Sequence, residues 1–217
     1  DETTNTTLYG YDQNSQDAPS TDANFGPFKV YGSTIEANRA ALKFHNVNLY
    51  SGSIITLGGM MTADKTAGFT DADWTLYSNI SATFNQNGGV FSSQNSTINL
   101  NHESNVIGSH GVEVSGGSVN FNGKVHDDGY ATANLISSDA TSGTVTINGD
   151  SKLNVNGDGA IYANKINLTN ASATIASDKK LFLDGMWTNK TAADAGSHTV
   201  SAITMNGFKV DGEGTLE

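Results

Sequence analysis

The chain has 217 residues, of which 36% are hydrophobic and 15% are charged, and it contains 24 glycines and no cysteine. Its net charge is −11 at pH 7 and Arg39 is its single arginine, which argues against nucleic acid and anionic membranes as partners because both bind clustered Lys and Arg. The absence of cysteine excludes disulfide bonds and thiol catalysis, and no apolar run reaches the roughly 20 residues of a membrane-spanning helix.

Short alternations of apolar and polar residues dominate the chain. No stretch carries the i, i+3, i+4, i+7 apolar stripe of an amphipathic helix. The apolar content is too low for a thick globular core, yet the alternation is too regular for a disordered chain. We therefore expect an all-β fold with a thin core.

Residues 1–24 are polar, and Leu8, Tyr9 and Tyr11 are their bulky apolar residues. The end of a stack of strands exposes an apolar cross-section and unpaired edges, so this segment is expected to be a lead-in or an N-terminal cap. Residues 25–217 contain no Pro-rich or charged linker and are expected to form a single domain, as a fragment of a longer mature chain.

Alternation begins after Phe25. Residues 47–57 and 74–84 each contain two apolar pairs that begin eight residues apart. This shared spacing predicts that the two stretches are equivalent strands of neighbouring repeats, and that residues 58–73 form a loop between them.

The middle of the chain continues the alternation. Residues 96–100, 112–121 and 134–138 are predicted strands, and residues 122–133 are predicted to form a second loop between them. Insertions of this kind leave stacked strands intact and gather on the surface, so a specific site is expected in the two loops.

Two consecutive blocks, residues 144–164 and 165–185, share one pattern of three short alternations separated by Asn, Gly, Asp and Ser. The alternation that begins at Val145 recurs at Ile166, and the one that begins at Leu153 recurs at Ala173. Three short strands per repeat, each with one buried face, predict a parallel β-helix, or β-solenoid, with coils of about 21 residues. At that period the whole chain would form about ten coils.

Side chains in a strand point alternately to opposite faces, so the polar residues between buried positions should face solvent. Stacked amides can bond along the coils and still offer donors and acceptors outward, which suits a surface of many weak polar contacts. The alternative is that Asn and Thr simply suit turns and exposed strands. The candidate binding residues on this surface are Asn99, Asn101, Asn120, Asn122, Thr146, Asn154, Asn156 and Asn167.

Three further candidate binding residues lie beside or within insertions. Asp127 and Asp128 belong to the second loop, where a polar turn is the alternative interpretation. Trp187 lies beside a third insertion, which precedes Val200, and is a candidate for stacking on a sugar.

The alternative function is a β-helix polysaccharide lyase or glycoside hydrolase acting on acidic glycans. Residues 109–111 (SHG) and the pair Asp127 and Asp128 resemble fragments of the polygalacturonase GHG and DD motifs, but their order is reversed and the accompanying NTD and RIK motifs are absent. The chain also lacks GxSxG and the HxxxH or HxH spacing of zinc sites. We therefore expect no enzyme, no catalytic residue, no metal and no cofactor, and leave open a single calcium site at Asp150 or Asp158.

The irregular short coils, the SGSxI and NGxSxLxVNG units, the acidity and the absence of cysteine resemble the passenger domains of Gram-negative autotransporters, especially self-associating adhesins. The resemblance covers nearly the whole chain from Phe25. It implies a right-handed β-helix with three strands per coil, export through the outer membrane to the cell surface, and a role in aggregation, biofilm formation or virulence. The implied partner is an identical passenger on a neighbouring cell, or a host glycan or matrix protein. A passive spacer for another module is the remaining alternative.

Overall fold

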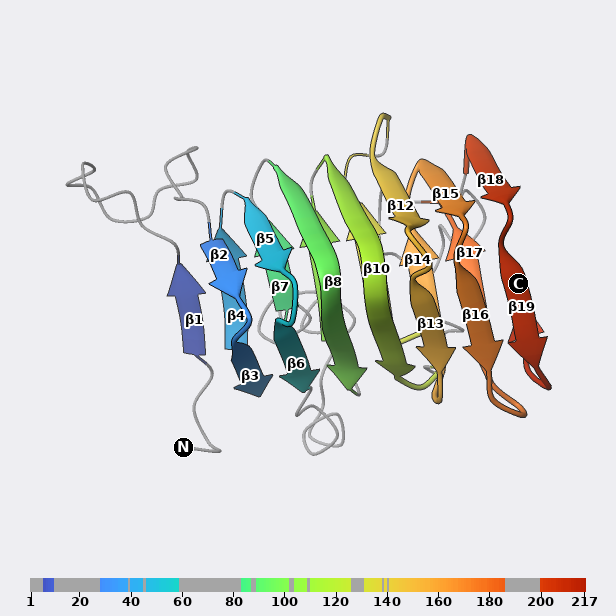
Figure 1. Ribbon diagram of the computed structural model, residues 1–217, viewed down its shortest axis with the longest axis horizontal. Helices are drawn as coiled ribbons and strands as arrows, with labels where there is room; N and C mark the ends of the chain where they lie inside the picture. The colour runs from blue at the N-terminus through green and yellow to red at the C-terminus, as the bar shows by residue number, and fades with distance from the viewer. Residues whose placement is uncertain are drawn as a thin grey trace, which may run out of the picture.

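The computed structural model describes the following parts of the chain: residues 6–9, 28–38, 40–44, 46–58, 83–86, 89–101, 104–108, 110–125, 131–137, 139, 141–185 and 200–217. These residues form an all-β structure, as expected, and no helix occurs among them. Every pairing between their named strands is parallel and in register along the molecule (Figure 1).

The strands form three stacks that run along the molecule. The first stack contains β2 (Phe28–Tyr31), β5 (Val47–Tyr50), the first halves of β8 (Val90–Asn101) and β10 (Gly111–Asn122), β12 (Thr144–Asn148), β15 (Lys165–Thr169) and β18 (Ala202–Asn206). The second stack contains β3 (Thr34–Asn38), β6 (Ile54–Gly58), the second halves of β8 and β10, β13 (Lys152–Val155), β16 (Ser172–Ile175) and β19 (Lys209–Gly212). Because β8 and β10 run through both stacks without a break, the first two stacks join into one sheet of 12 strands.

The third stack is a separate sheet of eight strands. It contains β1 (Thr6–Tyr9), β4 (Ala40–Phe44), β7 (Thr83–Gln86), β9 (Ser104–Gly108), β11 (Ala133–Ser137), β14 (Gly159–Tyr162), β17 (Lys180–Asp184) and β20 (Thr215–Leu216). Its first strand, β1, lies within the expected lead-in and pairs with β4. The rest of residues 1–24 lies outside the described residues.

The chain visits the first, second and third stacks in turn and then returns to the first stack beside the strand it left. The described residues make seven such passes, from 28–44 to 202–216. A constant period of about 21 residues predicts about ten, and that expectation is wrong because three connections are long. The long connections follow β6, β10 and β17. With a constant period, some of their residues would belong to strands.

The strand register confirms the repeat in residues 144–164 and 165–185. Val145 pairs with Ile166, and Leu153 pairs with Ala173, as the alternation predicts. The strands predicted over 96–100 and 112–121 lie within β8 and β10, and β11 covers residues 134–137 of the strand predicted over 134–138, whose last residue lies outside the described residues. The alternation of apolar and polar residues therefore predicts the positions of the strands in this part of the chain.

The expected equivalence of residues 47–57 and 74–84 is wrong. Val47 pairs with Phe91, whereas Phe84 lies in the third stack. Most of the second stretch lies outside the described residues. Two apolar pairs eight residues apart can occur on either side of any corner, so this spacing does not identify the stack to which a strand belongs.

The core consists of apolar columns between the three stacks. Side chains at one register position lie above one another, and most inward side chains with a pass on both sides are fully buried by their neighbours in the adjacent passes. One such column contains Val47, Phe91, Val112, Val145 and Ile166, all fully buried. Burying an aliphatic or aromatic side chain of this size stabilises the fold by roughly 1.5–3 kcal/mol.

The corner between the first and second stacks requires a backbone that few residues adopt. In every described pass it contains a residue with positive φ: Gly32, Gly52, Asn95, Gly116, Gly149, Asn170 and Gly207. A Cβ on Gly116 would lie 2.2 Å from Oδ1 of Asn95, and one on Gly207 would lie 2.6 Å from Oδ1 of Asn170. Glycine is needed there both for its φ and because an asparagine of the preceding pass occupies the space.

A buried serine follows this corner in several passes and bonds to the preceding pass. The Ser53 hydroxyl accepts a hydrogen bond from Gly32 N at 3.1 Å, and the Ser151 hydroxyl accepts one from Gly116 N at 2.8 Å. The SGSxI and NGxSxLxVNG units thus have a structural reason: glycine supplies the left-handed backbone, and the serine hydroxyl accepts a hydrogen bond from an N–H group of the pass before it.

Candidate functional site

The candidate binding surface lies on the outward side of the second stack. Asn99 of β8, Asn120 of β10 and Asn154 of β13 share one register position. Asn120 Nδ2 donates to Asn99 Oδ1 at 2.6 Å, and Asn154 Nδ2 donates to Asn120 Oδ1 at 2.7 Å. We call these three half-buried residues the first amide ladder; it ends where Asn99 Nδ2 donates to Thr56 Oγ1 at 3.0 Å.

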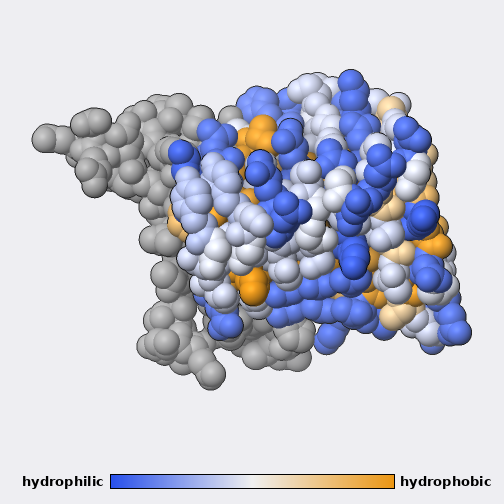
Figure 2. Space-filling model, viewed as in Figure 1, coloured by the Kyte–Doolittle hydropathy of each residue, from blue (hydrophilic) through white to orange (hydrophobic). Residues whose placement is uncertain are grey.

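A second amide ladder runs beside the first and contains Asn101, Asn122 and Asn156. Asn122 Nδ2 donates to Asn101 Oδ1 at 2.7 Å, and Asn156 Nδ2 donates to Asn122 Oδ1 at 3.2 Å. Its members are two residues further along the same chain direction, so they point to the same side of the sheet as the first ladder. Figure 2 shows hydrophilic side chains in rows across this part of the molecule.

The ladders exist because the strands are parallel and in register. Neighbouring strands lie about 4.8 Å apart, a distance that two asparagine side chains span with one hydrogen bond. An amide has two N–H donors and an oxygen with two lone pairs, and an interior member uses one donor and one lone pair within the ladder. One donor and one lone pair per residue are left to face solvent, repeated at the strand spacing.

The first ladder is the neutral centre of a longer outward column. In register order this column contains Glu36, Thr56, Asn99, Asn120, Asn154, Thr174 and Asp211. Glu36 and Asp211 at its two ends are exposed. A ligand that lies along the column therefore meets uncharged donors and acceptors in the middle and carboxylates at both ends.

The other predicted residues do not all join the ladders. Thr146 and Asn167 face outward at one register position of the first stack, around the corner from both ladders. The structure therefore divides the predicted surface into two groups on adjacent faces. Asp127, Asp128 and Trp187 lie outside the described residues.

One amide pair was missed by the sequence reasoning. Asn134 Nδ2 of β11 donates to Asn105 Oδ1 of β9 at 2.7 Å, on the third stack. Asn134 is only 8% exposed, and its own Oδ1 has no hydrogen-bond partner among the described residues. The two residues are 29 positions apart. The long connection after β10 makes their separation larger than the expected period of about 21 residues. The pair therefore cannot be predicted from a fixed period.

Two aspartates of the described residues, Asp139 and Asp158, are used in local structure. Hydroxyl and backbone N–H groups of Ser142 and Thr141 donate to Asp139 and hold the pKa of its carboxyl well below its usual range. Asp158 is 8% exposed and accepts from Lys180 N at 2.9 Å. Within the described ranges, no three His, Asp or Glu side chains gather as they would to hold a metal ion.

Comparison with known proteins gives no family for this chain. No family model matches it, and no curated protein and no solved structure matches it. In the part of the chain that the structure describes, there is no helix long and apolar enough to cross a membrane. The function is therefore inferred from the ladders and from the stacks that carry them.

Proposed function

We propose that this chain is a passenger domain of a Gram-negative autotransporter, folded as a right-handed parallel β-helix with three strands per coil and displayed on the cell surface. The support for the fold is the constant order in which the chain visits three parallel stacks, pass after pass. The resemblance in coil length and in corner units supports the family. Stacked passes supply stability by repetition, which suits an exported chain without disulfide bonds.

The proposed role is adhesion, by self-association with identical passengers or by attachment to a host glycan or matrix protein. The observation that carries it is the pair of amide ladders, which presents a regular, uncharged row of donors and acceptors. One such contact contributes only about 0.5–1.5 kcal/mol, because it replaces a hydrogen bond to water. Repetition along the stacks, and many copies per cell, would supply the affinity through avidity.

Cell clumping and ligand attachment, measured on cells that display the chain, test this role. The double substitution Asn120→Lys and Asn154→Lys places two charges on the first ladder, and Asn167→Lys places one on the adjacent face. We expect the double variant to reduce binding by about tenfold or more, because each disrupted contact is repeated across many copies. Ser177→Lys, in the exposed turn after β16, is the control for the added charge.

The double variant and Asn167→Lys also show which face of the molecule binds, the one with the ladders or the adjacent face of the first stack. If Asn167→Lys alone abolishes clumping, the first stack is the adhesive face and the ladders are structural. If neither variant changes clumping or attachment, the proposed role of the outward Asn surface is wrong. Beads coated with the chain alone separate the two partners, since they clump only if passengers bind each other.

A further inference from the structure

The bonds within the amide ladders leave one edge of each amide group free. Asn120 Nδ2 donates to Asn99 Oδ1, and Asn154 Nδ2 donates to Asn120 Oδ1, so the bonds all run in one direction along the stack. In such a row, the N–H that donates is the one that points away from the oxygen of its own amide. The second N–H and the second lone pair of the oxygen then lie side by side on one edge.

This free edge is turned toward solvent. The central carbon of an amide side chain bonds to the oxygen, the nitrogen and Cβ, and Cβ lies on the side of the backbone. The edge between oxygen and nitrogen therefore points away from the sheet. Asn120 and Asn122, the interior members of the two ladders, each offer one donor and one acceptor next to each other.

A vicinal diol of a sugar fits this edge. Two hydroxyl groups on neighbouring ring carbons present an O–H donor and an oxygen acceptor side by side, so both can bond to one amide. A peptide group or an N-acetyl group has its N–H and C=O on opposite sides and cannot fill both positions. The edge therefore favours sugars with free neighbouring hydroxyls.

The spacing of the two ladders indicates an extended chain of such sugars. Successive amides of one ladder lie one strand spacing apart, about 4.8 Å, and the two ladders run side by side about 6.6 Å apart. Each sugar of an extended β-1,4-linked chain advances the chain by a distance close to the strand spacing, and successive sugars are turned over. A flat chain lying between the ladders thus presents its diols to the first and the second ladder in turn.

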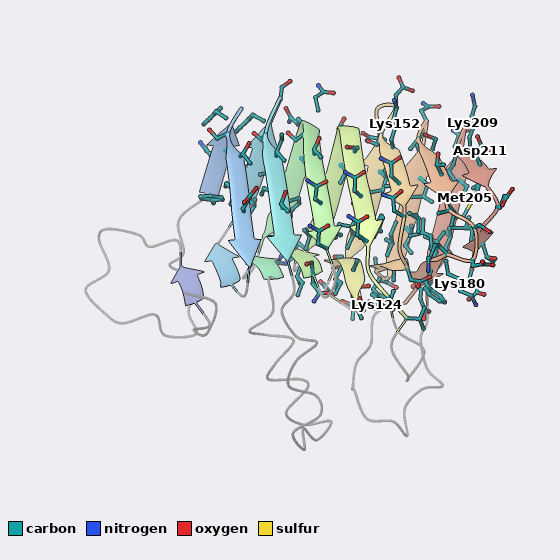
Figure 3. The ribbon with its side chains drawn as sticks, turned by 90° about the horizontal axis from the view of Figure 1, so that it is seen from below. Lys124, Lys152, Lys180, Met205, Lys209 and Asp211 are labelled. Carbon is teal, nitrogen blue, oxygen red and sulfur yellow. The ribbon has the colours of Figure 1, made fainter. Side chains whose placement is uncertain are left out.

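The charges around the ladders favour an uncharged ligand. Glu36 and Asp211, at the two ends of the outward column, are exposed carboxylates, and Lys152 is the one charged residue at the outward positions of β8, β10 and β13 in the second stack (Figure 3). The other residues at these positions are Thr97, Asn99, Asn101, Ser118, Asn120, Asn122, Asn154 and Asn156. An acidic glycan along the ladders would meet a single cation and a carboxylate at each end of the column.

A second copy of the chain fits the ladders less well. If the first ladders of two copies met face to face about a two-fold axis along the stacks, Glu36 would meet Glu36 and Asp211 would meet Asp211. With the axis across the stacks, Glu36 of each copy would meet Asp211 of the other. Both arrangements bring carboxylates together at both ends of the column, and like charges facing each other across an interface are unfavourable.

We propose that the two ladders together bind an extended, uncharged β-1,4-linked polysaccharide with free vicinal hydroxyls, which lies along the stacks. This inference rests on the proposed adhesive role of the ladders and names their ligand class. Each diol makes a weak contact, and a row of diols on many displayed chains supplies the affinity.

Binding isotherms of the whole chain on insoluble cellulose and on chitin test the ligand class. Chitin has the same linkage, but an N-acetyl group replaces one hydroxyl of each diol. We expect saturable binding to cellulose and binding to chitin that is weaker by about tenfold or more, because the amide edges are left without one partner. Cellulose oxidised to the uronate at C6 keeps the linkage and the diols but adds negative charge, and it should also bind more weakly.

Threonine substitutions test the ladders without adding charge. Thr56 already occupies the outward column of the first ladder, so the fold accepts threonine there. Asn120→Thr and Asn122→Thr should each weaken binding to cellulose by about tenfold, since each interrupts one of the two rows. Asn167→Thr, in register with Thr146 on the first stack, is the matched control and should leave binding unchanged. Thermal melting followed by circular dichroism checks that each variant is folded.

Three results would overturn the inference. Equal binding to cellulose and chitin would exclude recognition of the diol. Binding to cellulose that both ladder variants leave unchanged would place the polysaccharide elsewhere on the chain. Absence of binding to cellulose would remove this ligand class, and the adhesive role would then stand only if beads or cells still clump or attach through the ladders. If clumping and attachment are absent as well, the adhesive role is also wrong.

Discussion

Strand β10 carries two different repeats on its two faces. Val119 and Phe121 point inward and are fully buried, whereas Asn120 and Asn122 alternate with them and point outward into the ladders. The same register aligns both sets, but the two sets contribute differently to the stability of the fold. The inward columns remove apolar surface from water and account for most of the stability, while each amide bond adds only about 0.5–1.5 kcal/mol. The outward face can therefore vary with function while the inward face holds the fold.

The largest expected effect is on the inward face of this strand. Phe121→Ala should lower the free energy of unfolding by about 3–5 kcal/mol, because it removes a buried ring and leaves a cavity beside Gly159. Chemical denaturation measures this change. Phe121→Leu is the matched control and should cost less than about 1.5 kcal/mol. If Phe121→Ala and Phe121→Leu lower the free energy of unfolding equally, the surrounding core collapses around the smaller side chain and leaves no cavity.

The corner of β10 between the first and second stacks should be the next most sensitive position. Gly117 has a φ of 77°, and a Cβ there would lie 2.1 Å from the backbone oxygen of Ser96. Gly117→Ala should therefore cost about 1–3 kcal/mol, because neither the φ nor the neighbouring backbone can adjust easily. Ser115→Ala, on an exposed residue of the same strand, should change the thermal midpoint little. A melting curve unchanged by Gly117→Ala would contradict the geometry of the corner.

A smaller effect is expected on the outward face, and it should depend on position in the ladder. Asn120→Ala removes hydrogen bonds to both Asn99 and Asn154 and should cost about 1–2 kcal/mol. Asn154→Ala removes only the bond to Asn120 within the ladder and should cost roughly half as much. Denaturant titration compares the two variants under one condition. If the terminal substitution costs as much as the central one, the ladder bonds do not act individually.

The smallest expected effect has the opposite sign. Ser93 occupies an inward position between Leu49 and Val114, and its buried hydroxyl has no hydrogen-bond partner among the described residues. Ser93→Ala removes an unsatisfied polar group and should stabilise the fold by up to about 1 kcal/mol. Thermal melting would show a raised midpoint. A lowered midpoint would indicate that the hydroxyl has a partner after all.

Much of the fold could be predicted from the sequence because strand alternation is local. Val145 and Ile147 alternate with Thr146 and Asn148 whatever the rest of the chain does, and this alone assigns the two faces. Asn and Gly mark the corners since they tolerate positive φ, as Asn170 and Gly207 do. The pairing of Val145 with Ile166 can be predicted because the connections between them are short.

The candidate site was predicted only in part. The outward orientation of Asn99, Asn120 and Asn154 follows from alternation, but the order in which their amides donate to one another depends on the strand register. Asn120 and Asn154 are 34 residues apart, across a long connection. A search at a fixed period does not find that pair.

The sequence by itself determined which side chains of each strand face inward and where the backbone turns, because both depend on residues close together in the chain. Only the tertiary structure decided which strands pair, because partners such as Val47 and Phe91 are separated by connections whose length alternation does not encode. It also decided which inward residues are buried. Ile166 and Ile203 have the same pattern and the same register position, yet one is fully buried and the other exposed, since burial requires a strand on both sides.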